Sequence, residues 1–161
     1  MKLKHLIIAC LLFAVLICNT AYAQSDSDED ITEYTILHEY VDTIESSDES
    51  EIVPYSDSFT SCRLSFSSYD DYVHIYFSTG YSRSVSQIGM YNFKLQKKVW
   101  YGWKDVFSRS ELSNSNASFC ARGYDIVAEH GETYRLKGTH FVVIGGTLKT
   151  LSNTTPEYVY K

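Results

Sequence analysis

The stretch that decides the fold is ETYRLKGTHFVVIGGTLKTL, residues 132–151. Its apolar side chains alternate with polar ones, which is the pattern of a half-buried β-strand rather than of a helix. Gly145-Gly146 lies between two such runs and is a strong signal for a tight hairpin turn. The sequence therefore predicts two antiparallel strands, residues 132–144 and 147–151, near the C-terminus.

The same alternation continues through residues 59–161, which we interpret as one domain with a single core. The other strands that it predicts are residues 59–66, 72–79, 88–97, 99–108, 117–128 and 158–160, with a polar loop at 113–116. Short strands separated by turn residues predict an all-β fold, an antiparallel β-sandwich of about seven strands.

A short motif resembles part of a known fold. GETYRLK, residues 131–137, resembles the start of the sixth strand of fibronectin type III and related immunoglobulin-like domains. The resemblance implies a tyrosine corner, in which the Tyr134 hydroxyl bonds to nearby backbone. It implies an immunoglobulin-like sandwich for this domain.

Residues 59–161 are also similar to a family of small secreted proteins of unknown function from Gram-positive, Clostridia-like bacteria. The matching positions are Leu95-Gln96-Lys97 followed by Trp103, and Gly123-Tyr124 followed by Tyr134-Arg135. In an immunoglobulin-type domain a cysteine would stand two residues after the corner tyrosine, where this chain has Leu136. The resemblance implies export and a β-sandwich, and it carries no catalytic residue.

The N-terminus has the pattern of a secretory signal peptide. Two lysines precede an apolar run from Leu6 to Cys18, and Ala21-Tyr22-Ala23 follows as an A-x-A cleavage site. We therefore expect residues 1–23 to be removed and the protein to be secreted and extracellular, with no membrane span afterwards. The alternative is an uncleaved membrane anchor, for which the run is short.

Charge separates the next segment from the domain. Residues 24–58 carry twelve acidic residues and no Lys or Arg, whereas residues 59–161 carry twelve Lys or Arg and eight acidic residues. Charge of one sign with few hydrophobic residues favours a disordered acidic arm or linker. A stripe at helical spacing leaves open a transient amphipathic helix over residues 31–44. We expect the arm to lie over the basic stretch Lys94–Lys104 at low salt.

Two cysteines remain after signal cleavage, Cys62 and Cys120. A pair in an exported protein permits one disulfide, and the alternative is two separate buried thiols. In the standard sandwich that the resemblance implies, the strands that carry the two residues lie on either side of a third strand, roughly 9–10 Å apart. A disulfide needs Cα atoms within about 7 Å, so the bridge would require a displaced strand.

Catalytic motifs are absent from the sequence. It contains no nucleophile elbow, zinc-protease helix, phosphate-binding loop or catalytic-cysteine signature. The histidines are not spaced as metal ligands. We therefore expect no catalytic residue, no metal and no cofactor, and a protein that is not an enzyme.

Aromatic residues give the best indication of a binding surface. Trp100, Tyr101 and Trp103 fall on both faces of the predicted strand 99–108, so at least one faces outward. Aromatic side chains are also ordinary strand residues, which is the alternative. The sequence predicts a non-enzymatic extracellular binding or interaction module for cell-envelope glycan or protein, with no nucleic acid partner. A structural spacer or self-assembling subunit, and an unrecognised hydrolase, are the alternatives.

Overall fold

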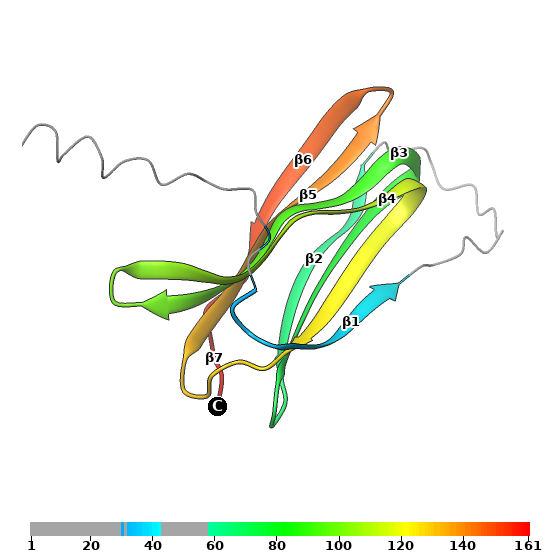
Figure 1. Ribbon diagram of the computed structural model, residues 1–161. Helices are drawn as coiled ribbons and strands as arrows, with labels where there is room; N and C mark the ends of the chain where they lie inside the picture. Colours follow the sequence, from blue (N-terminus) through cyan, green and yellow to red (C-terminus); the bar gives the residue numbers. More distant parts are fainter. Residues whose placement is uncertain (1–29, 31, 43–57) are drawn as a thin grey trace, which may run out of the picture.

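The computed structural model of the chain describes residues 30, 32–42 and 58–161. The predicted signal peptide, residues 1–23, and much of the predicted arm lie outside these residues. Every regular element in the described part is a β-strand, and all strand pairings are antiparallel (Figure 1). The prediction of an all-β antiparallel fold is confirmed. Among these residues no helix has the length and hydropathy that a membrane crossing requires.

The described strands form one open sheet of seven members. They are β1 Ile36–Asp42, β2 Phe59–Ser68, β3 Val73–Val99, β4 Gly102–Ile126, β5 Thr133–Ile144, β6 Thr147–Thr154 and β7 Tyr158–Val159. Five of them are neighbours in the order β1-β4-β3-β5-β6, while β2 pairs with β3 and β7 with β5. The predicted hairpin at Gly145-Gly146 is confirmed between β5 and β6. This order does not by itself show an immunoglobulin-like topology.

Two strands are much longer than predicted. β3 has 27 residues and β4 has 25, so each joins two predicted strands, and β4 includes the predicted loop 113–116. Gly80 does not end its strand, because the β3–β4 register shifts after it and pairing resumes at Val85 and Ala117. Asn116 has a φ of 50° at this point. A bulge bends a paired ribbon without ending it, which is why the turn residues were wrongly interpreted as strand ends.

The bend lets β3 exchange partners along one edge. Residues 73–81 pair with β2, and residues 87–97 pair with β5, while β4 follows the other edge of β3 on both sides of the bend. β2 and β5 therefore leave the same edge of β3 in different directions. We call this divergence the fork; Figure 1 shows it between β2 and the β5–β6 pair.

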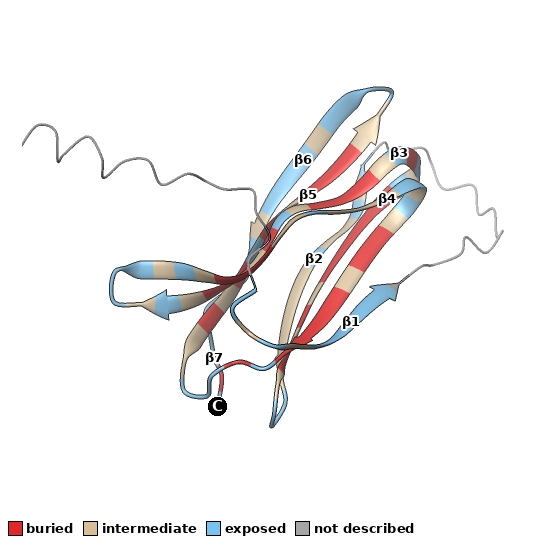
Figure 2. Cartoon of the chain, in the orientation of Figure 1, coloured by how far each residue is buried: buried red, intermediate tan, exposed pale blue. Residues whose placement is uncertain are grey.

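A single hydrophobic core lies across both sides of the bend. Before the bend, Val73, Ile75 and Phe77 are fully buried, whereas His74 and Tyr76 lie on the other face, as the alternation predicts. Figure 2 shows the buried residues running along β3, β4 and β5. The buried residues beyond the bend include Ile88, Met90, Phe93, Leu95, Phe107, Tyr134, Leu136 and Val142. Each large side chain buried in this way stabilises the fold by about 1.5–3 kcal/mol.

The predicted acidic arm contributes a strand to the sheet. Residues Ile36–Asp42 form β1, which pairs with β4 from Ile126 to Ala121. The expectation of a disordered arm or a transient helix is therefore wrong for these residues. Leu37 and Val41 belong to the helical stripe but are exposed. Pairing with the open edge of β4 satisfies the backbone of the segment, and this outweighs its local helical pattern.

Gly89 marks the closest approach of β3 and β4. A Cβ atom at Gly89 would overlap the carbonyl oxygen of Leu112 and lie 2.8 Å from the Cα of Ser113. Because both are backbone atoms of the ladder, we predict that Gly89→Ala lowers the free energy of unfolding by about 2 kcal/mol or more. Urea unfolding followed by circular dichroism measures this. In the matched control Gly138→Ala, the new Cβ meets the flexible Met90 side chain and the loss should be smaller. Equal losses in the two variants would contradict the prediction.

Candidate functional site

The most exposed aromatic residues form the tip of the β3–β4 hairpin. Trp100 and Tyr101 occupy the turn between the paired residues Val99 and Gly102. Gly102 has a φ of 135°, a conformation open to glycine. The Trp100 side chain is 94% exposed and that of Tyr101 is 65% exposed. Their rings meet edge to face, with centroids 5.1 Å apart. The two residues therefore protrude from a turn, and the expectation that they lie within a strand is wrong.

Trp103 has a different role from its neighbours. It lies on β4, partly buried, with the Arg135 guanidinium 4.1 Å from its ring centroid and the Lys98 ammonium 5.8 Å away. Arg135 also donates a hydrogen bond of 2.8 Å to Gln96 Oε1, which holds the guanidinium in place. Stacking of this kind stabilises by about 0.5–2 kcal/mol. Trp103 thus strengthens the base of the hairpin and is not displayed together with Trp100.

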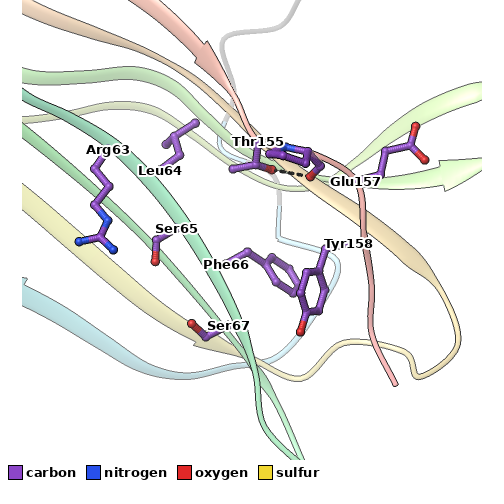
Figure 3. Close-up of a pocket in the computed structure, with 9 residues that line it drawn as sticks. Arg63, Leu64, Ser65, Phe66, Ser67, Thr155, Glu157 and Tyr158 are labelled. Atoms are coloured by element: carbon purple, nitrogen blue, oxygen red, sulfur yellow. Dashed lines mark hydrogen bonds between the residues drawn. The ribbon is translucent and has the colours of Figure 1, made fainter.

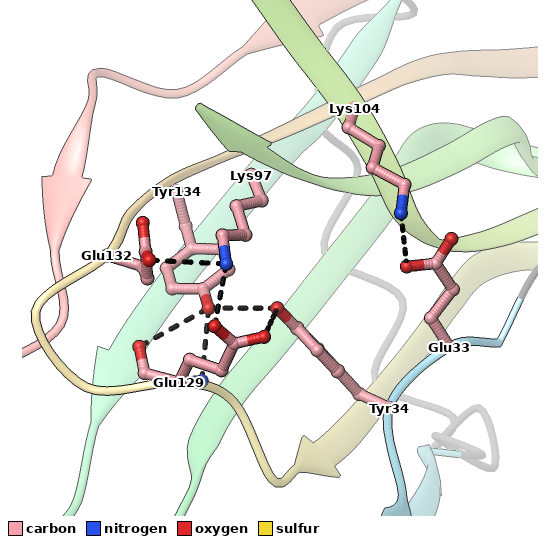
Figure 4. Close-up of polar contacts among 7 residues, drawn as sticks. All are labelled: Glu33, Tyr34, Lys97, Lys104, Glu129, Glu132 and Tyr134. Carbon is pink, nitrogen blue, oxygen red and sulfur yellow. Dashed lines mark hydrogen bonds and ion pairs between the residues drawn. The ribbon is translucent and has the colours of Figure 1, made fainter. Parts of the chain in front are cut away.

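The predicted basic stretch is neutralised by carboxylates. Ion pairs join Lys94 to Asp105 at 2.8 Å, Lys97 to Glu129 at 2.7 Å, Lys98 to Glu157 at 2.7 Å and Lys104 to Glu33 at 2.9 Å. The hydrogen bond to Glu129 raises the pKa of Lys97, and the bond to Glu33 raises that of Lys104. Since Glu33 belongs to the predicted arm, the arm contacts the basic stretch at Lys104 (Figure 4). This pairing leaves little positive charge here for an anionic polymer.

Tyr134 makes the backbone contact that its motif implies. Its hydroxyl accepts a hydrogen bond of 3.1 Å from the Glu129 amide and lies 3.3 Å from the Glu129 carbonyl oxygen. The Tyr34 hydroxyl approaches the same oxygen atom of Tyr134 at 3.2 Å and donates to Glu129 Oε1 at 3.1 Å (Figure 4). Burial and the bond to Tyr134 raise the pKa of Tyr34. This cluster fixes the segment before β1 against the start of β5.

A second polar cluster lies on the outer face of β1, β4 and β3. Asp125 is only 3% exposed and accepts hydrogen bonds from Tyr40 at 2.7 Å and His74 at 2.6 Å. His38 lies 3.4 Å from the same carboxylate. Burial by itself would raise the pKa of Asp125, but the bonds from His74 and Tyr40 outweigh it, so the pKa is lowered. No local sequence pattern indicates this cluster, because its members meet only through the strand register.

The contacts of the Asp125 cluster indicate a structural role. Its contacts include no Ser, Thr or Cys hydroxyl or thiol that a His74–Asp125 pair would activate. Within the described residues no three His, Cys, Asp or Glu side chains gather as metal ligands. The cluster instead joins β1 to the sheet, because Tyr40 and His38 come from β1 while Asp125 comes from β4.

A groove of about 420 Å³ opens at the fork, between β2 and the segment that leads into β7. Its lining comes from residues 63–67 of β2 and residues 155–158. The rings of Phe66 and Tyr158 lie side by side in it, with centroids 4.6 Å apart (Figure 3). The sequence analysis did not find this groove, although Pro156 does interrupt the strand pattern there.

Cys62 and Cys120 are free thiols in this structure. Each pairs in register with Thr79 of β3, from opposite sides, so one strand separates them. The two cysteines are therefore separated by one strand, as the sequence predicted, and they form no disulfide in this structure. Burial raises the pKa of each thiol to about 11; beside Cys120, Arg122 partly offsets this effect.

His140 is a fully buried, neutral histidine near the bend. Its Nδ1 lies 2.7 Å from Thr79 Oγ1, and that hydroxyl donates its proton to the Gly89 carbonyl oxygen at 2.9 Å. These two bonds assign the ring proton to Nδ1. Nε2 is buried and has no hydrogen-bond partner among the described residues. Burial lowers the pKa of His140 to about 4.

No known protein family matches the chain, and no curated protein or solved structure matches it either. The resemblances to immunoglobulin-like domains and to small secreted bacterial proteins therefore rest on the sequence motifs. The structure shows an antiparallel all-β sheet.

We predict that His140 makes the protein less stable in mild acid. An unfolded histidine titrates near 6.5, whereas the folded pKa is about 4. As the pH falls between these values, only the unfolded state gains the proton, so the free energy of unfolding falls by up to about 3 kcal/mol. Below pH 4, titration of His140 causes no further fall in the free energy of unfolding. Urea unfolding of the parent and of His140→Leu at several pH values measures the effect. The free energy of unfolding of His140→Leu should depend less steeply on pH than that of the parent. An equal dependence in the two proteins would contradict the lowered pKa of His140.

We predict that both thiols react slowly in the folded protein. The thiolate is the reactive form, and a pKa of about 11 leaves little of it at pH 8. Iodoacetamide treatment followed by peptide mapping should show little modification of Cys62 or Cys120 in buffer and rapid modification of both in urea. A disulfide-linked pair of peptides from the unreduced protein would contradict the prediction.

Proposed function

We propose that this protein is a secreted, non-enzymatic binding module that contacts its partner through Trp100 and Tyr101. The observation that carries the proposal is the exposure of both rings, 94% and 65%, at the end of the β3–β4 hairpin. Large aromatic side chains supply contact area at a low cost in conformational entropy. The signal peptide pattern supports export, and the absence of catalytic motifs supports a role in binding.

The shape of the tip favours a protein partner over a cell-envelope glycan. Sugar rings stack on a flat aromatic face, whereas the planes of Trp100 and Tyr101 meet at 88° on a protruding turn. A projecting indole is suited to a pocket on a partner, in the manner of an interface hot spot. Trp103 and Arg135 stiffen the hairpin beneath it, so the tip is held in place before binding.

We also propose a specific fold type for the domain. We place the domain with immunoglobulin-like, fibronectin type III-like sandwiches and with the small secreted bacterial proteins that it resembles. The contact between the Tyr134 hydroxyl and the Glu129 backbone supports this, since a tyrosine corner makes the same kind of bond.

A self-assembling structural subunit is a second proposal, favoured by the open strand edges. β1 and β6 stand at the two ends of the strand order, and each pairs along only one side among the described strands. Unprotected edges can pair with other copies of a chain. Sedimentation of the protein across concentration tests this: persistent monomer argues against it.

We predict that Trp100→Ala and Tyr101→Ala each weaken binding to the producing cells' surface by at least tenfold, because each ring is a central contact. Binding of the labelled protein to cell-surface preparations measures this, before and after protease treatment. Tyr69→Ala is the matched control, since Tyr69 is half exposed in the β2–β3 turn. Loss of binding after protease treatment identifies a protein partner. Unchanged binding by both tip variants would exclude the tip as the contact site.

A further inference from the structure

β2 has one edge that the sheet leaves unpaired. It pairs with β3 on one side, and the described strands include no partner for it on the other. An open strand edge carries a row of backbone donors and acceptors that can pair with another chain. β5 pairs with β3 beyond the bend instead of with this edge, and the groove of about 420 Å³ lies beside it.

The hydrogen-bond pattern shows which backbone groups face the groove. The Tyr69 amide donates to the Tyr72 carbonyl oxygen, so this pair forms the hydrogen-bonded rung at the β2–β3 turn. In an antiparallel ladder the direction of the backbone groups alternates, and odd-numbered positions of β2 from this turn back to Ser61 therefore face β3. The amides and carbonyls of Leu64 and Phe66 face the groove instead. The carbonyl oxygen of Cys62, another even-numbered position, is consistent with this alternation, because it accepts a hydrogen bond from Asn153 on the groove side.

Two side-chain bonds close the groove at its ends and leave its centre open. Asn153 Nδ2 donates to the Cys62 carbonyl at 3.3 Å, and the hydroxyls of Ser68 and Tyr158 lie 2.9 Å apart. Between these points, the groove-facing backbone groups of Leu64 and Phe66 have no hydrogen-bond partner in the described part of the chain. The interval from Cys62 to Ser68 is about 20 Å of extended strand, enough for a segment of about six residues.

The two faces of β2 differ in chemistry beside this edge. Leu64 and Phe66 lie on the core side, where Tyr158 continues the apolar surface. Arg63 lies on the opposite face together with Ser65 (Figure 3). Among the described residues the Arg63 guanidinium is exposed and has no carboxylate partner, whereas the nearby Glu157 is already paired with Lys98. Within the part of the chain that the structure describes, Arg63 is therefore a cation without a carboxylate partner beside an apolar groove.

We propose that this groove binds an extended segment of a partner protein by strand addition to β2. The segment pairs its backbone with Leu64 and Phe66. Its alternate side chains are apolar, on the side of Phe66 and Tyr158, and the side chains between them include an Asp or Glu that faces Arg63. Backbone pairing supplies affinity in this mode of recognition, and the alternation supplies specificity. This site is separate from the hairpin tip and does not depend on it.

A blocked hexapeptide of sequence TVEVTV is the probe, and fluorescence anisotropy with the full chain is the measurement. The valines meet the apolar face and the glutamate meets Arg63. We expect saturable binding, reduced at least tenfold when the peptide amides that face β2 are N-methylated, because methylation removes the donors and leaves the side chains in place. The scrambled peptide VVTTEV, which lacks the alternation, should bind at least tenfold more weakly.

A charge exchange tests the role of Arg63. Arg63→Glu should weaken binding of TVEVTV and strengthen binding of TVKVTV, so that the paired changes restore affinity. Leu64→Pro removes one groove-facing amide without removing a bond to β3, since proline is tolerated at a free strand edge, and it should weaken both peptides. Trp100→Ala should leave peptide binding unchanged, so failure of the tip and failure of the groove are distinguishable.

Three results would overturn this proposal. The first is equal binding of the N-methylated and parent peptides. The second is the absence of any coupling between the charge at position 63 and that of the peptide. The third is concentration-dependent association of the chain that Arg63→Glu and Leu64→Pro both abolish, because the occupant of the edge would then be a second copy of this protein. Thermal unfolding of each variant confirms that it is folded before binding is compared.

Discussion

The continuous pairing of β3 with β4 is the constraint on which this structure depends. The two strands pair from Val73–Ile126 to Val99–Gly102, with register shifts after Gly80 and after Leu95, and β1, β2 and β5 pair directly with this ribbon. β1 attaches to the edge of β4, while β2 and β5 share the edge of β3. The hairpin tip is the closed end of the same ribbon. A change that separates β3 from β4 at the bend would therefore disturb the core, the fork and the tip together.

Thr79 and the Nδ1 atom of His140 are buried at the bend and hydrogen-bonded, whereas Nε2 of His140 has no partner among the described residues. Thr79 stands between Cys62 and Cys120 and links the His140 ring to the Gly89 carbonyl. A buried hydroxyl that donates and accepts avoids the penalty of an unmet hydrogen bond. The exterior follows the same rule, since the four lysines near the hairpin each meet a carboxylate. The aromatic tip is exposed to solvent, and the edge of β2 that faces away from β3 has no strand partner among the described residues.

The sequence predicted what depends on local pattern and missed what depends on register. Alternation identified the strand faces, and Gly145-Gly146 identified the hairpin, because both signals lie within a few residues. The predicted strand ends near Gly80 and Asn116 were wrong, because glycine and asparagine permit a bulge as readily as a turn. Trp100 and Tyr101 were proposed as exposed aromatics from their places in a predicted strand, and the structure places them in the hairpin turn instead. The groove and the Asp125 cluster were missed because their members come from distant segments, which no local pattern brings together.

The attachment of β1 has a consequence for how the chain folds. Tyr40 and Asp125, which clamp β1 to β4, are 85 positions apart in the sequence. Because the chain is synthesised from its N-terminus, β1 is made long before β4, the strand with which it pairs. Closing the long loop between β1 and β4 is also slow compared with forming the β3–β4 hairpin. Meanwhile the negative charge of residues 24–58 keeps this segment hydrated and opposes its pairing with other copies of itself. The acidic composition thus protects an edge strand during the interval in which it has no partner.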